Sequence, residues 1–327
     1  MFLFDSNRIM IRKNMRHFFL LFISILFFDT VFAQLDSPLA FTKKSVSGLE
    51  MLGLKGKVRS LEQIAYKVID NNGKPGKGGR LMPKSFFVNG DFSVDFDSLG
   101  RILSESIVEG GEMRKWIHIY DLAKNTEIIT KPFNKGNEFT KTVYTYNKDG
   151  KIARTFWEQY YNEKEDFQTT VNMKLDAKGN VVESKSTMIG RGETTNLRGT
   201  FKYNSKNQLI CTDGYGENGG FWNRVKYSYD PKGDRTKEEY YMTDTTKVEH
   251  SVTFVYDEKG NVKKKEIENF NTYTYDAKGN VSKKPDGTIK KVFTYVYTYD
   301  KFGNWVSRTD YENGKATAII ERELVYY

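Results

Sequence analysis

The sequence predicts an all-β protein in which tandem antiparallel β-hairpins form one elongated, twisted or spiralling sheet. Three observations lead to this prediction. A short motif returns along the chain at similar spacing, aromatic and polar residues alternate before most of its copies, and a glycine follows nearly every copy at a fixed distance. Internal repetition is decisive for architecture because repeated units bury their apolar faces against their neighbours.

The motif reads aromatic, any residue, aromatic, Asp or Asn, two further residues and Gly, as in residues 144–150, 273–279 and 297–303. The turn residue lies at the following positions: Asp97, Asn147, Asp176, Asn204, Asp230, Asp257, Asp276 and Asp300. A degenerate copy lies at Asp121. The residue three positions later is Gly in most copies: Gly100, Gly150, Gly179, Gly233, Gly260, Gly279 and Gly303, with Asn207 replacing it once.

Each copy is typical of a hairpin. An Asp or Asn side chain bonds backbone N–H groups ahead of it, and Gly then adopts a positive φ that closes a type I turn with a bulge. Asn207 obeys the same rule, because Asn tolerates positive φ better than most residues. Before the turn, aromatic residues such as Tyr297 and Tyr299 flank polar Thr298. This period of two predicts one aromatic face and one solvated face. Generic hairpins of a β-sandwich are the alternative, but the constant register favours an array.

These residues resemble the YD-repeat family, also called RHS repeats, over about residues 92–327. The resemblance implies a spiral of antiparallel strands, as in bacterial toxin complexes, Rhs toxins and teneurins, and some members have been associated with carbohydrate binding. The chain departs from the large members, because it has too few repeats to enclose a cargo and no cargo domain is expected. The string Asp230-Pro231-Lys232-Gly233-Asp234 lies mid-array and lacks the Leu of the element that ends the Rhs core. We therefore expect a small secreted bacterial member without a toxin cargo domain.

The N-terminus predicts a secretory signal peptide over residues 1–33. A basic stretch precedes an apolar run over 18–28, and a small-residue cleavage pattern ends at Ala33. The mature chain is expected to be secreted, periplasmic or at the cell surface, with no transmembrane segment. Residues 34–91 are expected to form a lead-in and capping strands, and residues 92–327 the repeat array. Cys211 is the single cysteine, so no internal disulfide is expected.

The two ends of the array have strand-like sequences. Residues 57–69 are rich in β-branched and aromatic residues, which predicts a long strand that starts the sheet. Residues 71–79 are expected to form a flexible loop, and residues 131–139 another. Residues 322–327 resemble the first strand of a repeat that stops before its turn, and we expect them to cap the sheet.

Catalytic and metal-binding patterns are not expected. His118 replaces an aromatic residue of the degenerate repeat, and His250 stands alone. Asp91, Asp95 and Asp97 lack the terminal acidic residue of a calcium loop. No cofactor, metal or nucleic-acid partner is therefore predicted. The formal net charge is +9, but basic residues such as those at 263–265 are interspersed with acidic ones. A solvated, edge-protected β surface is the favoured interpretation, and binding of an anionic polymer is the alternative.

The predicted function is that of a non-catalytic exported scaffold that binds carbohydrate or another cell-envelope polymer. The candidate ligand-binding residues are aromatic: Phe221, Trp222, Trp157 and Trp305. Phe221 and Trp222 follow a Gly-rich loop over 214–220, which would present a ring to a ligand. One alternative is a structural or protein-interaction module of the envelope or of a toxin or secretion system. The other is an enzyme with an unrecognised site.

Overall fold

A computed structural model describes residue 49 and residues 52–81, 91–109, 112–132, 138–148, 150–161, 164–190, 192–242, 244–269, 273–275, 281–283 and 289–327. The predicted signal peptide lies outside the described residues. Within these ranges the secondary structure is almost entirely β, which confirms the all-β prediction. No helix among them is both long and apolar enough to cross a bilayer.

The strands follow one another along the chain with short connections. They are Val58–Asn71 (β1), Lys74–Arg80 (β2), Phe92–Phe96 (β3), Ile102–Glu109 (β4), Glu112–Asp121 (β5), Thr126–Pro132 (β6), Phe139–Tyr146 (β7), Ile152–Tyr161 (β8), Lys164–Leu175 (β9), Val181–Gly190 (β10), Glu193–Tyr203 (β11), Leu209–Tyr215 (β12), Phe221–Tyr229 (β13), Arg235–Tyr241 (β14), His250–Tyr256 (β15), Val262–Asn269 (β16), Tyr273–Tyr275 (β17), Val281–Lys283 (β18), Ile289–Tyr299 (β19), Trp305–Glu312 (β20) and Lys315–Tyr326 (β21).

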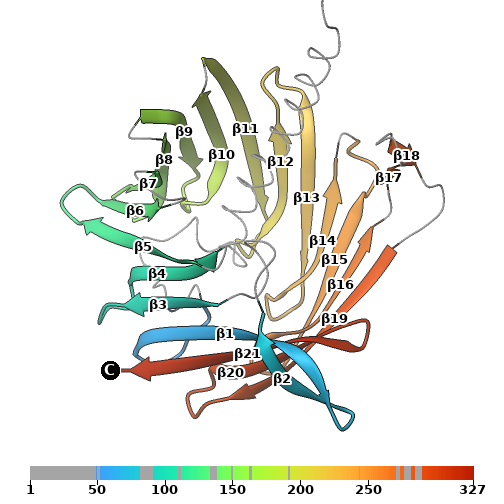
Figure 1. The fold of residues 1–327 in the computed structure, drawn as a ribbon. Helices are drawn as coiled ribbons and strands as arrows, with labels where there is room; N and C mark the ends of the chain where they lie inside the picture. Colours follow the sequence, from blue (N-terminus) through green and yellow to red (C-terminus); the bar gives the residue numbers. More distant parts are fainter. Residues whose placement is uncertain are drawn as a thin grey trace, which may run out of the picture. The chain divides into compact units, whose positions relative to one another are not determined.

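The main sheet closes on itself. Each strand from β3 to β16 pairs with its neighbour in sequence, and β16 continues through β19 and β20 to β21. The closing step is β1, which pairs with β3 along one edge and with β21 along the other (Figure 1). The prediction of an elongated or spiralling sheet is therefore wrong: the strands form a closed 18-strand antiparallel barrel, with β2 attached to β1 outside the ring.

The closure has a simple physical cause. Residues 57–69 and 322–327 were each expected to cap one end of an open array, and a cap of this kind still leaves unpaired N–H and C=O groups. In the structure the two ends pair with each other, with Leu61 opposite Leu324 and Glu62 opposite Glu323. Pairing the first strand with the last removes both free edges at once.

Two further segments differ from the expectation of one continuous array. Residues 71–79 are not a flexible loop, because β2 pairs with β1 in a hairpin that turns at Asn72 and Gly73, both with positive φ. The copy of the motif at 273–279 lies outside the main sheet: β17 and β18 form a separate two-stranded sheet between β16 and β19. Asp276 and Gly279 themselves lie outside the described residues. Within 131–139, β6 ends at Pro132 and β7 begins at Phe139.

The repeated turns share one geometry. The backbone N–H of the residue four positions after the turn Asp or Asn donates to its side-chain Oδ1 at 2.8–2.9 Å, at positions 97, 147, 176, 204, 230, 257 and 300. The glycine of each turn, or Asn207, has a positive φ between 67° and 101°. Because these turns join odd-numbered strands to the strands that follow, they lie at the same end of the barrel.

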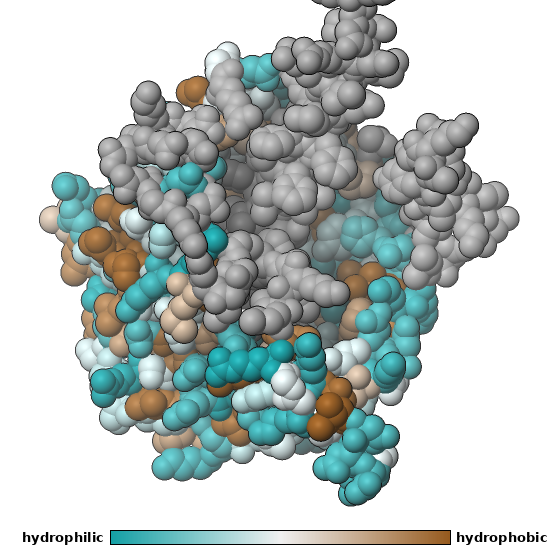
Figure 2. All heavy atoms as spheres, in the orientation of Figure 1, coloured by the Kyte–Doolittle hydropathy of each residue, from teal (hydrophilic) through white to brown (hydrophobic). Residues whose placement is uncertain are grey.

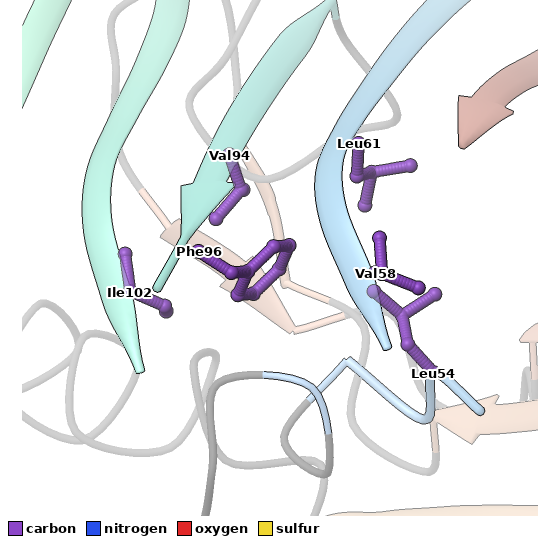
Figure 3. Close-up of a cluster of buried hydrophobic side chains, with 6 residues drawn as sticks. All are labelled: Leu54, Val58, Leu61, Val94, Phe96 and Ile102. Carbon is purple, nitrogen blue, oxygen red and sulfur yellow. The ribbon is translucent and has the colours of Figure 1, made fainter. Parts of the chain in front are cut away.

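Alternate residues of each strand point to opposite faces of the sheet. One face carries Leu61, Ala65, Val94, Phe96 and Ile320, all buried. We call it the core face, and the face in register with Glu62 the outer face. Side chains converge on the concave side of a closed sheet, so the core face is the inner one. Figure 3 shows a buried cluster at β1, β3 and β4, which consists of Leu54, just before β1, and of Val58, Leu61, Val94, Phe96 and Ile102.

Candidate functional site

A continuous row of side chains crosses six neighbouring strands on the outer face. Each member is the direct cross-strand partner of the next, from β8 to β13: Arg154, Asn172, Lys185, Arg198, Tyr215 and Phe221. We call these six residues the basic row. Neighbouring strands lie about 4.8 Å apart, so the row extends over roughly 24 Å. It presents cations at one end and aromatic rings at the other.

The polar part of the basic row is open to solvent. Arg154, Asn172, Lys185 and Arg198 are all exposed, and 52% of the Arg198 side chain is accessible. Figure 2 shows that hydrophilic residues are spread over the visible face of the molecule, with apolar residues in small groups between them. Long cationic side chains that stay in water remain available to a polymer that approaches from solvent.

Two cations of the row face each other directly. Lys185 on β10 is the cross-strand partner of Arg198 on β11. Like charges placed directly opposite in a sheet are destabilising. Glu183 relieves part of the repulsion, because the Arg198 Nε lies 2.8 Å from its Oε1. The hydrogen bond from Arg198, and then the nearby charges of Arg198, Lys185 and Lys174, hold the pKa of Glu183 below its ordinary value. The Glu183 carboxylate thus lies near several cations, and the row retains a net positive charge.

The other end of the row is aromatic. The rings of Tyr215 and Phe221 meet edge to face, with centroids 6.3 Å apart. Arg198 lies over the Tyr215 ring at 5.4 Å and Arg224 lies over the Phe221 ring at 5.8 Å. Both rings are half-buried. Guanidinium groups and aromatic rings therefore lie together at this end of the row. This combination suits a ligand that has both charged groups and flat apolar faces.

Asp213 anchors the cations beside the aromatic end. It is buried, and the Arg224 Nε donates to its Oδ1 at 2.5 Å. The Cys211 thiol also lies near this carboxylate, at 3.8 Å. Burial, and then the negative charge of Asp213, raise the pKa of the Cys211 thiol. A thiol held protonated is a poor nucleophile, so the surroundings of Cys211 do not activate it.

The four aromatic candidates from the sequence do not come together. Phe221 belongs to the basic row. Trp222, its neighbour, lies at the bulge between β12 and β13. Trp157 and Trp305 lie on the core face, where Trp157 is the partner of Thr142 and Thr169, and Trp305 is covered by the Arg322 guanidinium at 3.4 Å from the ring centroid. No sugar could stack on the covered face of Trp305 without displacing that guanidinium.

The two histidines of the described chain have different surroundings. His118 lies on the core face with Nδ1 2.9 Å from Glu127 and Nε2 2.9 Å from Glu105. Burial would lower its pKa, but the hydrogen bonds to the two carboxylates outweigh burial and raise it. His250 stacks on Tyr240 with ring centroids 3.9 Å apart, and burial lowers its pKa. Within the described ranges no group of three or more His, Cys, Asp or Glu side chains could hold a metal ion.

No family model matches the chain. No curated protein matches it either. Among solved structures the chain is similar to a porin-like protein from Bacteroides uniformis ATCC 8492, with 13% identity over 83% of this chain and 99% of that chain and a TM-score of 0.40. It also matches the structure of TcdB2-TccC3-Cdc42, with 12% identity over 71% of this chain and 20% of that chain and a TM-score of 0.18. Both scores are low, so the fold rests on the strand pairings above, and the YD-repeat resemblance stays a prediction.

Sequence reasoning missed most of the basic row. Arg154, Asn172, Lys185 and Arg198 belong to no motif and lie at different distances from their turns. The signal that could have found them is register. Each turn fixes which residues of its flanking strands are partners. The hairpin in which Gly190 pairs with Glu193 places Lys185 opposite Arg198. The turns at Asp176 and Asn204 place Asn172 opposite Lys185 and Arg198 opposite Tyr215. That alignment also needs the bulges after each turn, which shift the register by one residue.

Proposed function

We propose that this chain is a non-catalytic, exported binding scaffold whose basic row holds an extended anionic polysaccharide or a similar cell-envelope polymer. The single observation that supports it most is the direct opposition of the exposed cations Lys185 and Arg198. A bound polyanion would neutralise both side chains and remove their repulsion, so binding is favoured by a strain already present in the free protein.

The arrangement of the row fits an extended ligand rather than a compact one. Arg154, Lys185 and Arg198 lie on strands β8, β10 and β11, so their charges are spaced along one line across the sheet. Several weak contacts to a repeated acidic group add up to a useful affinity without a deep pocket. Tyr215 and Phe221, at the end of the line, would stack on the flat face of a sugar ring.

Export is the second part of the proposal. It rests on the expected signal peptide, with its basic stretch, its apolar run and the small-residue pattern that ends at Ala33. A protein delivered outside the cytoplasm meets acidic polysaccharides of the envelope, which carry the charges that the basic row lacks.

The test compares two double variants that remove the same charge from the outer face. Lys185→Ala with Arg198→Ala removes the opposed pair. Lys264→Ala with Lys290→Ala is the control, because these two lysines lie outside the basic row and share Glu266, at 2.7 and 3.4 Å. Binding of polygalacturonate is measured by calorimetry, with neutral dextran as a second ligand.

We expect the affinity of the first variant to fall by about tenfold or more, because two charge-assisted contacts are lost. The affinity of the control should fall by less than about twofold. Dextran should bind at least about tenfold more weakly than polygalacturonate. Equal losses in the two variants, or no binding of the acidic polymer by the unaltered chain, would show that the row is an ordinary solvated surface.

A further inference from the structure

Arg322 is a cation that has no carboxylate partner among the described residues. It lies on β21, on the core face, opposite Gln63 of β1. Its Nε donates to the Gln63 Oε1 at 3.1 Å, and its guanidinium carbon lies 3.4 Å from the centre of the Trp305 ring. Within the part of the chain that the structure describes, no carboxylate oxygen comes within 4.0 Å of its nitrogens. The two terminal nitrogens thus keep their donors for another acceptor.

A second arginine shares the same ring. The Arg308 guanidinium carbon lies 5.3 Å from the centre of the Trp305 ring. Arg308 is compensated, because it bonds Asp310 through two nitrogens, at 2.6 and 2.9 Å. Among the described residues, two guanidinium groups and one carboxylate therefore lie at this indole, and this set carries one net positive charge. Burial, and then the charge of Arg308, lower the pKa of Arg322 to about 9.

An uncompensated cation at this place is expensive for folding alone. Removing a charge from water without a partner is unfavourable, and an apolar residue would pack as well against Trp305. Because no described carboxylate pairs with this half-buried guanidinium, we look for an acceptor beyond the described residues, and a bound ligand is the candidate. The planar fork of an arginine matches the two oxygens of a carboxylate, which carries the one negative charge that the cluster lacks.

We propose that Arg322, stacked on Trp305 and oriented by Gln63, binds the carboxylate of a small organic acid on the core face of the barrel. This site is separate from the basic row, which lies on the outer face. Tyr297, whose ring centroid is 5.9 Å from that of Trp305, bounds the site on the side of β19. The Tyr297 hydroxyl is already committed to the carbonyl of Val262, so the arginine is the principal donor to the ligand.

The experiment uses the full mature chain and sodium glucuronate, with sodium chloride of equal ionic strength as the reference and sodium phosphate as a third arm. Thermal unfolding and intrinsic tryptophan fluorescence are followed in each. We expect glucuronate to raise the unfolding temperature and to change the tryptophan emission, because the ligand contacts the cation that covers Trp305. Stabilisation confined to phosphate would overturn the assignment of a carboxylate.

Three variants complete the test. Arg322→Met should lose the glucuronate response and, without ligand, should be at least as stable as the unaltered chain. Arg322→Lys keeps the charge but not the fork, and should weaken binding by about tenfold to a hundredfold. Lys264→Met, on the outer face and outside the basic row, should leave the glucuronate response unchanged, which shows that the loss of any surface cation does not abolish it. A full glucuronate response in Arg322→Met, or a clear loss of stability in that variant without ligand, would overturn the proposal.

Discussion

The hydroxyl of Tyr229 donates a hydrogen bond of 2.7 Å to the carbonyl oxygen of Leu209, the first residue of the neighbouring strand β12. The same relationship recurs around the barrel, each time from a core-face tyrosine to the first residue of a strand that follows a turn: Tyr120 to Ile102, Tyr203 to Val181, Tyr256 to Arg235 and Tyr297 to Val262. A bulge lies at each of these strand starts, where the ladder is interrupted and a carbonyl needs a partner. The repeated tyrosines are therefore explained by structure, without a ligand.

Tyr229→Phe should destabilise the fold by about 1–2 kcal/mol, because the Leu209 carbonyl loses its partner in a partly buried place. Urea unfolding followed by circular dichroism measures the change. Tyr311→Phe is the control, since Tyr311 lies on the outer face and its hydroxyl makes no hydrogen bond among the described residues. Equal effects of the two substitutions would refute the role of the hydroxyl.

Gly260→Ala should cost about 1–2 kcal/mol, although a Cβ there would meet no atom within 4 Å. The whole cost comes from the backbone, because Gly260 has a φ of 86°. Gly220→Ala is the matched control: its Cβ also meets nothing and its φ lies outside the left-handed region, so stability should stay the same or rise by up to about 1 kcal/mol. Gly260→Asn should be milder than Gly260→Ala, because Asn207 holds the equivalent position. Thermal unfolding of the three variants is sufficient, and a neutral Gly260→Ala would contradict the turn geometry.

The protein should lose stability in acid through its turn aspartates. Burial opposes the shift, but hydrogen bonds to Asp257 and Asp300 lower the pKa of both carboxyl groups in the folded state. A folded-state pKa below the unfolded value means that the contribution is complete above about pH 4 and is lost as the pH falls through the lowered pKa. Asp257→Asn with Asp300→Asn keeps an acceptor for the turn, as Asn147 and Asn204 do, but cannot titrate. Unfolding free energies between pH 7 and pH 2 should fall less steeply in this variant, and parallel curves would count against the argument.

Closure of the barrel can be tested by a disulfide between the first and last strands of the ring. Glu62 and Glu323 are direct partners on β1 and β21. With Cys211 replaced by Ser, Glu62→Cys and Glu323→Cys should form an intramolecular bond on mild oxidation, because partners in adjacent strands lie within disulfide reach. Mobility on non-reducing gels reports the bond, and each single-cysteine variant is the control. In an open array the two thiols would lie apart. Oxidation would then give either monomers without a crosslink or intermolecular dimers.

The local structure could be predicted from the sequence because its causes are local. An Asp or Asn followed three residues later by Gly is enough to form the turn, and the alternation of Tyr297, Thr298 and Tyr299 is enough to assign the two faces. Closure could not be predicted in this way. It depends on β1 and β21 meeting across almost the whole length of the chain, and strand periodicity contains no information about which free edges will pair.

Only part of the candidate site could likewise be predicted from the sequence. Phe221 was predicted from the Gly-rich segment before it, and it lies in the basic row. Trp157 and Trp305 were candidates for sugar stacking on the condition that their rings face outward, and their register places them on the core face. No sequence pattern links Lys185 with Arg198, because their proximity arises only when β10 pairs with β11. The sequence identifies the types of residue, and the strand register decides which of them are neighbours.

The most direct test of the binding proposal is the salt dependence of polygalacturonate affinity. Cations that contact a polyanion release its counterions, so the logarithm of the affinity should fall linearly with the logarithm of the salt concentration. The variant with Ala in place of Arg154, Lys185 and Arg198 should show a slope smaller by about one for each contact removed. A slope identical to that of the unaltered chain would mean that these three side chains do not touch the polymer, and the proposed function would then be wrong.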